Sequence, residues 1–367
     1  MSFGARALIR LAALDHNLDI LKARVPDARI MAVIKANAYG HGMIPVARHL
    51  HHADSFAVAR LPEAVQLREA GIEQPIVLLS GVRSKRELRD AAEHCCEIVV
   101  HCPEQVELLD TECVRRLTAW LKVDTGMNRL GFRPEEAARR IEQLQTSPTV
   151  GEIRLMTHIA SADDPSNPAT VQQLDAFRGV ASGFDGSVSI ANSPTMLGFS
   201  EIANAAREFG FKGEQWIRPG IAMYGISPFP GRTAAEFGLR PVMQFEAKLI
   251  AKKPLPSGSR VGYTGRYVSD KDTTLGVISA GYGDGYTRHF RDGTPILLND
   301  RRVSLIGNVS MDMTAVDLGP NSNDRVGDTA VLWGDDLPIE DVAPYAGTIP
   351  YELVCGVSNR EDSKVIA

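Results

Sequence analysis

Several side chains capable of acid–base or covalent chemistry lie where apolar, strand-like runs end. Lys35 follows the run "MAVI" within "AVIKANAYGHG", and Lys122 lies in "LKVDTGMNRLGF". His158 occurs in "MTHIAS", Ser193 in "ANSP" and Arg218 in "IRPGIAMYG". Taken singly, a lysine in such a place is most often a solvated surface charge, and a lone histidine is most often a structural residue. As a set, these cations would need an anion to neutralise them.

The chemistry that this set favours is the binding of a phosphorylated aldehyde. The segment "RPGI" offers backbone N–H groups after its proline, and Tyr39 and Ser193 offer hydroxyls, so a phosphate would fit. A lysine in the same pocket can form a Schiff base with an aldehyde. Phosphate, aldehyde and a polar partner for a ring nitrogen together describe pyridoxal 5′-phosphate (PLP). Carbonyl chemistry on a lysine without a cofactor, as in class I aldolases, stays open at this point.

The elements that must position these side chains alternate between β-rich runs and amphipathic helical stretches such as "LPEAVQLREAG" and "RPEEAARRIEQLQ". Eight runs have strand composition: "RIMAVI", "SFAVA", "PIVLLSG", "CEIVVH", "LTAWLKV", "IRLMTHI", "SVSIAN" and "QWIRPGI". Alternation of this kind predicts an α/β fold in which crossovers join parallel strands, and eight units predict a TIM-like (β/α)8 barrel. A doubly wound open sheet is the alternative. In a barrel, the named side chains would meet at the carboxyl ends of the strands.

The sequence pattern changes from alternating strand-like and helical segments to mostly strand-like segments after about residue 232. Segments such as "TPILLNDRRVSLIGNVSMDMTAVDL" and "GDTAVLWG" have strand composition broken by turn residues, and helical periodicity is weak until "IEDVAPYAG". We therefore expect a barrel domain over residues 1–231 and a mostly β domain over residues 232–367.

Composition and charge narrow the function classes. The 367 residues are 44% hydrophobic and 23% charged, which is ordinary for a soluble globular protein, and a net charge of −5 favours neither a nucleic-acid nor a membrane partner. The start has no secretory signal pattern, and no apolar window is long enough to span a membrane. The five cysteines form no C-x-x-C pair, which argues against a structural metal site and a disulfide framework. We expect a cytoplasmic protein.

A family resemblance narrows these alternatives. "AVIKANAYGHG" is similar to the PLP-lysine signature of the alanine racemases. "LKVDTGMNRLGF", "MTHIASAD", "IRPGIAMYG", "VGYTGRY", "GYGDGY", "VSMDM" and "TIPYELVCGVSNR" resemble further blocks of that family, in the family's order. The resemblance covers nearly the whole chain. It implies a PLP-binding barrel followed by a β domain, and an enzyme that interconverts L-alanine and D-alanine, the latter for peptidoglycan.

The resemblance also implies the two bases and the substrate contacts. Lys35 would hold PLP covalently and remove the α-proton of the D-enantiomer, and Tyr263 would be the opposing base for the L-enantiomer, both acting on the imine that the substrate forms with PLP. Family members are homodimers in which this tyrosine enters the partner's active site. Arg129 would bind the substrate carboxylate beside Met311 of the partner subunit. Serine precedes this methionine in "VSMDM", where a cysteine would be expected.

The remaining roles concern the cofactor. The implied phosphate ligands are Tyr39, Ser193, Gly220, Ile221 and Tyr351. His158 would orient Arg218. Lys122 corresponds to a lysine that the family often carries as a carbamate, whose negative charge would position Arg129. No metal is implied.

Arg218 distinguishes the expected racemase from the PLP decarboxylases that share this barrel fold. Those decarboxylases have a glutamate before Pro-Gly, where this chain has Arg218. A carboxylate keeps the ring nitrogen protonated and the ring a strong electron sink, whereas an arginine keeps its own protons and donates a hydrogen bond. A weaker sink limits side reactions and suits clean proton exchange. A broad-specificity or serine racemase stays open, as does a non-catalytic PLP-binding protein, although the latter has no need of Tyr263 or Arg129. The segment between Ser193 and Arg218 is longer than expected and could reshape a loop near the phosphate.

Overall fold

The computed structural model describes residues 4–110, 115–199, 205–357 and 364–366. The chain divides into two compact units. The barrel unit comprises Leu18–Ala38 and Met43–Met223, and the β unit comprises Met1–Asn17, Tyr39–Gly42 and Tyr224–Ala367. This division differs from the expected one between residues 1–231 and 232–367, because the first strand of the chain pairs with strands of the β unit.

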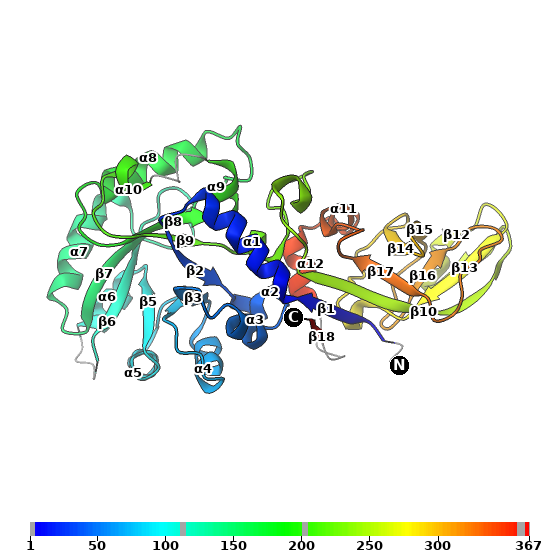
Figure 1. Cartoon of the computed structure of the whole chain (residues 1–367), viewed down its shortest axis with the longest axis horizontal. Helices are drawn as coiled ribbons and strands as arrows, with labels where there is room; N and C mark the ends of the chain where they lie inside the picture. Colours follow the sequence, from blue (N-terminus) through cyan, green and yellow to red (C-terminus); the bar gives the residue numbers. More distant parts are fainter. Residues whose placement is uncertain (1–3, 111–114, 200–204, 358–363, 367) are drawn as a thin grey trace. The chain divides into compact units, whose positions relative to one another are not determined.

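The barrel unit contains a closed barrel whose strands follow one another in chain order (Figure 1). The strands are β2 (Arg29–Val33), β3 (Ser55–Val58), β4 (Ile76–Leu78), β5 (Cys96–Val100), β6 (Leu117–Lys122), β7 (Val150–Met156), β8 (Val188–Asn192) and β9 (Gln215–Arg218). Every pairing is parallel, and β9 closes the barrel onto β2. All eight strand-like runs are confirmed as barrel strands, and the open-sheet alternative is wrong.

Helices follow the strands, as parallel pairing requires. They are α1 (Leu11–Arg24), α2 (Lys35–Tyr39), α3 (Met43–His49), α4 (Leu61–Glu69), α5 (Lys85–Glu93), α6 (Pro103–Leu109), α7 (Ala137–Thr146), α8 (Ala169–Ala181), α9 (Ser193–Gly198) and α10 (Ala205–Phe209). The helices expected in "LPEAVQLREAG" and "RPEEAARRIEQLQ" are confirmed as α4 and α7. Part of the long segment between Ser193 and Arg218, residues 200–204, lies outside the described residues.

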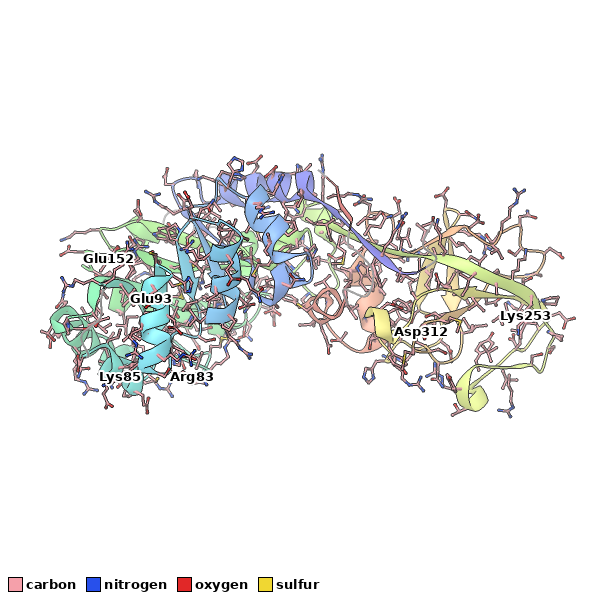
Figure 2. The ribbon with its side chains drawn as sticks, turned by 90° about the horizontal axis from the view of Figure 1, so that it is seen from below. Arg83, Lys85, Glu93, Glu152, Lys253 and Asp312 are labelled. Carbon is pink, nitrogen blue, oxygen red and sulfur yellow. The ribbon has the colours of Figure 1, made fainter. Side chains whose placement is uncertain are left out.

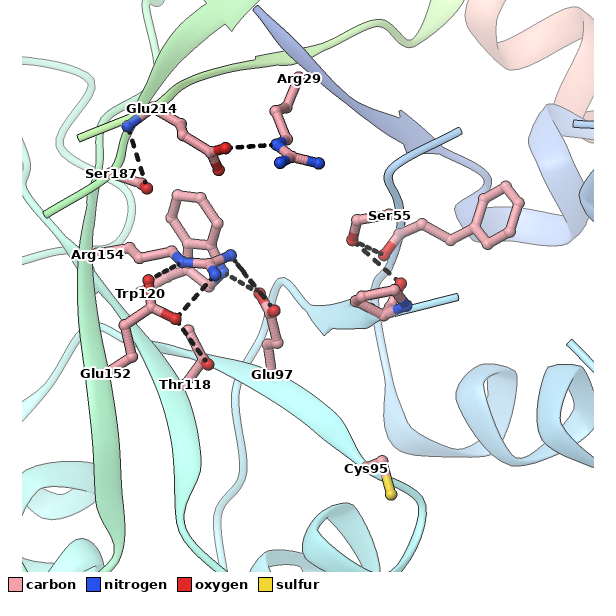
Figure 3. Close-up of polar contacts among 12 residues, drawn as sticks. Arg29, Ser55, Cys95, Glu97, Thr118, Trp120, Glu152, Arg154, Ser187 and Glu214 are labelled. Atoms are coloured by element: carbon pink, nitrogen blue, oxygen red, sulfur yellow. Dashed lines mark hydrogen bonds and ion pairs between the residues drawn. The ribbon is translucent and has the colours of Figure 1, made fainter. Parts of the chain in front are cut away.

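A packed polar cluster joins side chains of β5, β6, β7 and β9 (Figure 3). The guanidinium of Arg154 lies 5.3 Å from the ring centroid of Trp120 and 5.1 Å from that of Trp216. Glu97 accepts a 2.6 Å hydrogen bond from the indole nitrogen of Trp120 and pairs with Arg154 at 3.3 Å. Arg154 also pairs with Glu152 at 2.6 Å. These contacts tie four strands of the barrel together.

The β unit is built on one eight-stranded sheet with strand order β13-β16-β15-β14-β17-β10-β1-β18, in which β13 also pairs with β10. Its strands are β1 (Arg6–Arg10), β10 (Met243–Leu255), β13 (Thr273–Ile278), β14 (Pro295–Leu298), β15 (Arg301–Leu305), β16 (Thr314–Asp317), β17 (Thr329–Trp333) and β18 (Lys364–Ile366), and β11 (Arg260–Val261) pairs separately with β12 (Tyr267–Val268). All sheet pairings are antiparallel except that of β1 with β18. The mostly β character expected after residue 232 is confirmed.

The described part of the β unit also contains the short α-helices α11 (Ile339–Val342) and α12 (Pro350–Gly356). None of the described cysteines, Cys95, Cys96, Cys102 and Cys355, forms a disulfide, and Cys113 lies outside the described residues. Within the described ranges, no helix has the length and apolar character needed to cross a membrane. The same ranges contain no cluster of three or more acidic, histidine or cysteine side chains suited to a metal ion.

Candidate active site

The five chemically capable side chains singled out first lie at the carboxyl ends of five consecutive barrel strands. Lys122 and Arg218 are the last residues of β6 and β9, and Ser193 follows β8 directly. Lys35 and His158 each lie two residues beyond the end of a strand, β2 and β7 respectively. Because β6, β7, β8, β9 and β2 are neighbours in the closed barrel, the structure brings the set together at one rim.

Lys35 begins a left-handed turn. Ala36, Asn37 and Ala38 have φ of 53–54° and ψ of 45–51°, and Tyr39 has φ of 53°. A left-handed helical conformation costs an L-residue about 1–2 kcal/mol because its Cβ crowds the following carbonyl. Four successive non-glycine residues therefore store strain next to Lys35, and such strain persists only where surrounding contacts hold it. Two such contacts are the bonds from the Ala36 amide to Glu63 and from the Met43 amide to the Asn37 side chain, both 2.8 Å.

Cations concentrate at this rim and act on one another. Burial lowers the pKa of Lys122 well below its usual value, and the charges of Arg218, Arg129 and Lys35 lower it further. Asp124 opposes this shift. Burial and like charges thus both disfavour the charged form of Lys122, as expected for a lysine enclosed among cations.

His158 is held neutral by the same surroundings. Burial lowers its pKa well below the ordinary value, and Lys122, Arg218, Arg129 and Lys35 add to the shift. Its ring nitrogen Nε2 lies 3.4 Å from Nδ2 of Asn192, the residue that ends β8. A neutral imidazole can accept a hydrogen bond as well as donate one, which suits it to hold a neighbouring donor in place.

Arg218 is buried and its guanidinium is anchored to neighbouring strands. It donates to Ser189 Oγ on β8 at 2.5 Å, to the Thr157 carbonyl at 2.6 Å and to the Ile190 carbonyl at 3.2 Å. Only 4% of the residue is exposed, and burial lowers its pKa. The fixed fork of an arginine makes such a set possible while other N–H groups are left for a ligand. No carboxylate takes part in these bonds.

Ser193 lies next to the segment that follows β9. Its Oγ accepts hydrogen bonds from the amides of Gly220 at 3.0 Å and Ala222 at 3.2 Å. Ser193 and Ile221 are both buried. A hydroxyl and successive backbone N–H groups form the kind of cradle that binds a phosphate. The expected phosphate ligands Ser193, Gly220 and Ile221 therefore lie next to one another, and their binding of phosphate stays a prediction.

Two other expected ligands, Tyr39 and Tyr351, belong to the β unit and lie against each other. Their ring centroids are 6.3 Å apart, and the Tyr39 ring lies 5.0 Å from that of Tyr224. Burial raises the pKa of Tyr39, with a smaller contribution from Cys355. Both hydroxyls thus come from one tyrosine cluster, in which Tyr39 stays protonated.

Tyr263 and Met311 lie on the surface of the β unit. The exposed fraction is 66% for Tyr263 and 52% for Met311. The loop that carries Met311 links two exposed tyrosines, because Asn308 donates to the Tyr263 carbonyl at 3.0 Å and the Gly283 amide, next to Tyr282, donates to the Met311 carbonyl at 2.8 Å. Large apolar side chains gathered on one exposed surface are typical of a contact with another molecule.

The structure adds three residues that the sequence did not single out. Asp124 accepts the amides of Gly126 and Asn128 at 3.0 Å each, which shapes the loop that carries Arg129. Gln173 in α8 donates to Thr125 at 3.2 Å and to the His158 carbonyl at 3.1 Å. Glu63 binds the amide next to Lys35. The Asp-x-Gly pattern could have marked Asp124 as a turn residue. No local signal identifies the other two, whose partners are distant in sequence.

The fold and the site define the class of this protein. It is an enzyme whose single chain forms a (β/α)8 barrel and a mostly antiparallel β domain. Two family models match, alanine racemase N-terminal domain over residues 9–228 and C-terminal domain over residues 242–365. The chain belongs to the alanine racemase family, as its motifs indicated.

Comparisons with individual proteins and solved structures also support membership of this family. Alanine racemases of Vibrio vulnificus and Aeromonas hydrophila are 45% and 46% identical over 358 residues, with coverage of 97% of this chain and of 97% and 98% of theirs. The crystal structure of a biosynthetic alanine racemase from Pseudomonas aeruginosa matches with a TM-score of 0.93 and 38% identity over all of both chains. The racemase family, and not the decarboxylases that share the barrel, is thereby established.

Proposed function

We propose that this chain racemises alanine with PLP bound at the barrel rim. The observation that carries the proposal is the convergence of Lys35, Lys122, His158 and Arg218 at neighbouring strand ends, where positive charges lower the pKa of Lys122 and Asp124 opposes them. The positive charges of Lys35, Arg129 and Arg218, which lower the pKa values of Lys122 and His158, favour an anionic ligand at this rim. Membership of the alanine racemase family supports PLP and alanine as the cofactor and the substrate.

The residues present fit PLP. Lys35 would hold it covalently through its amine, since a lysine at a strand end can form a Schiff base with an aldehyde. Ser193, with the amides of Gly220 and Ile221, would take the phosphate, and Tyr39 and Tyr351 would add their hydroxyls. When bound, PLP supplies an electron-withdrawing ring that acidifies the α-carbon of an amino acid.

Arg218 would face the ring nitrogen as a hydrogen-bond donor. Its bonds to Ser189, Thr157 and Ile190 fix the guanidinium, and neutral His158, which follows β7, would hold its orientation. A guanidinium keeps its protons, so it would leave the ring nitrogen unprotonated. An arginine at the ring nitrogen would favour the return of a proton to the α-carbon over competing reactions. PLP decarboxylases on the same barrel have a glutamate in place of this arginine.

Racemisation needs two groups, one on each face of the α-carbon. We propose Lys35 for the D-enantiomer and Tyr263 for the L-enantiomer, each taking the proton from its own face and returning one to it in the reverse direction. Arg129 would hold the substrate carboxylate by a bidentate pair. Lys122, as a carbamate, would give Arg129 a negative partner.

We further propose a homodimer with shared active sites. Tyr263 and Met311 are exposed in the single chain, which is the arrangement expected if they serve the partner subunit's barrel. The enzyme would work in the cytoplasm and supply D-alanine for peptidoglycan. Serine is the competing substrate that this geometry leaves open, because it differs from alanine by one hydroxyl.

The direct test is an assay of the purified protein with PLP. L-Alanine should lose its optical rotation completely, and the D-enantiomer should reach half of the total. L-Serine run in parallel measures the specificity as a ratio of kcat/KM values. A protein that binds PLP but leaves the rotation of both amino acids unchanged would be a PLP-binding protein without racemase activity.

A further inference from the structure

The strained turn after Lys35 is tied to the rest of the barrel by one carboxylate. Glu63 Oε1 accepts the Ala36 amide at 2.8 Å. Its Oε2 accepts the amides of Ala59 at 2.8 Å and Arg60 at 3.0 Å. Ala59 and Arg60 follow β3, and Ala36 follows β2 by three residues. One side chain therefore links the carboxyl ends of two adjacent strands.

The Ala36 amide is a sensitive place for such a link. It belongs to the planar peptide group that begins with the carbonyl of Lys35, so holding this N–H fixes the orientation of that plane beside the Lys35 Cα. The plane in turn sets where the Lys35 side chain starts. Without an acceptor here, the left-handed turn could relax toward an ordinary conformation and turn the lysine with it.

We propose that Glu63 is a positioning residue for Lys35. A glutamate in the first turn of a helix ordinarily caps the amides just before that helix, and Oε2 of Glu63 does so for α4. Oε1 has a second role beyond capping the helix, because it accepts the Ala36 amide and so holds the left-handed turn that starts at Lys35, the lysine proposed to carry PLP. The inference rests on the proposed function for the identity of that lysine, while the contact itself belongs to the described structure.

The chain offers a matched control in α5. Glu87 stands at the same position of its helix, and its carboxylate accepts the Arg83 amide at 2.6 Å, while the Glu87 amide donates to Ser84 Oγ at 3.1 Å. Figure 2 shows Arg83 and Lys85 near the start of this helix and Glu93 at its other end. Glu87→Gln therefore weakens a helix cap on a neighbouring crossover, and the hydrogen bonds described for Glu87 do not include the Lys35 turn.

The experiment compares Glu63→Gln with Glu87→Gln in the PLP-loaded and PLP-free proteins. A carboxamide keeps one oxygen and loses the charge, so it cannot serve all three amides of Glu63. We expect amide hydrogen exchange in the peptide covering residues 35–42 to be about tenfold faster or more in Glu63→Gln, with or without PLP. In racemisation, kcat should fall about 10- to 100-fold with little change in KM, because misplacing a reacting group affects the chemical step. Glu87→Gln should change neither quantity.

A rescue separates this role from general destabilisation. Glycine adopts the left-handed conformation without the Cβ penalty. Ala36→Gly should therefore restore part of the exchange protection and of kcat in the Glu63→Gln background, and none in the Glu87→Gln background. Glu63→Asp provides a second variant if Glu63→Gln does not fold. It keeps the negative charge at the start of α4 but is one methylene too short to reach both strand ends.

Two outcomes would overturn the inference. One is equal exchange in residues 35–42 for both glutamine variants. The other is a Glu63→Gln enzyme whose kcat matches that of Glu87→Gln. A wild-type protein that neither binds PLP nor racemises alanine would instead refute the proposed function, and the exchange result in the PLP-free protein would still decide whether Glu63 holds the turn.

Discussion

Lys122 provides the sharpest electrostatic prediction of the account. Burial and the charges of Arg218, Arg129 and Lys35 all lower its pKa. The neutral amine is the form that adds CO2, and the resulting carbamate would place an anion among these positive groups. We therefore expect Lys122 to carry a carbamate that pairs with Arg129.

The size of the effect follows from the bond that would be lost. A hydrogen bond between charged groups contributes about 1.5–3 kcal/mol, which corresponds to a change of about 10- to 100-fold in a binding constant. Because Arg129 is proposed to hold the substrate carboxylate, Lys122→Ala should raise KM for alanine by about this factor. A smaller fall in kcat should accompany it, and acetate added to the buffer should restore part of the affinity.

The assay has a spectroscopic arm and a kinetic arm. Protein equilibrated with 13C-bicarbonate should show one slowly exchanging carbamate resonance, absent from Lys122→Ala. Lys212→Ala is the matched control, because the Lys212 amine is exposed and pairs with Asp185 at 2.6 Å. The reasoning is refuted if Lys122 retains no labelled carbon and if removing CO2 leaves KM unchanged.

Two further predictions concern the shared site and pH. Mixing Lys35→Ala and Tyr263→Phe subunits after dissociation should restore about a quarter of wild-type activity, since half of the dimers are mixed and each has one intact site of two. Activity at background in a mixture shown by native mass spectrometry to contain heterodimers would contradict the cross-subunit arrangement. Burial keeps the pKa of His158 in the folded protein well below its ordinary value. Below about pH 6.5, the unfolded chain therefore binds a proton at this residue that the folded chain does not bind. The free energy of unfolding then falls by up to about 1.4 kcal/mol for each pH unit of acidification. Urea unfolding of His158→Gln should show a shallower loss between pH 7.5 and 5.5 than the wild type, and parallel curves would show that His158 does not titrate on unfolding.

The barrel could be predicted because its signal is local. Each strand is a short β-rich run, and the intervening helices carry their own start and stop residues, as α4 does with Pro62 at its beginning. The positions of Lys35, Lys122 and Arg218 at strand ends followed from the same runs. Their meeting at one rim followed from the barrel alone, since parallel strands place all carboxyl ends on one side.

Contacts between distant parts of the chain could not be predicted in this way. The strand over residues 6–10 is short, and its partners in β10 lie more than 200 residues away, so its assignment to the β unit needed the structure. The anchoring of Arg218 by Ser189 and of Ala36 by Glu63 likewise joins residues from different strands.

The left-handed turn after Lys35 could not be predicted from the sequence for a different reason. Glycine and asparagine ordinarily mark such backbone, whereas here Ala36, Ala38 and Tyr39 adopt it with only Asn37 among them. Local propensity therefore predicts a loop or an ordinary helical turn. Tertiary contacts override it at the residue next to the proposed catalytic lysine, where conflict between local and global preference is typical of a functional site.

Lys35 is the residue proposed to carry PLP, and borohydride reduction of the PLP-loaded enzyme, followed by proteolysis and mass spectrometry, identifies the labelled lysine. We expect a pyridoxyl group on the peptide that contains Lys35, bleaching of the visible absorption band, and neither the band nor the label in Lys35→Ala. A pyridoxyl group on the Lys122 peptide instead would contradict the assignment of the two lysines.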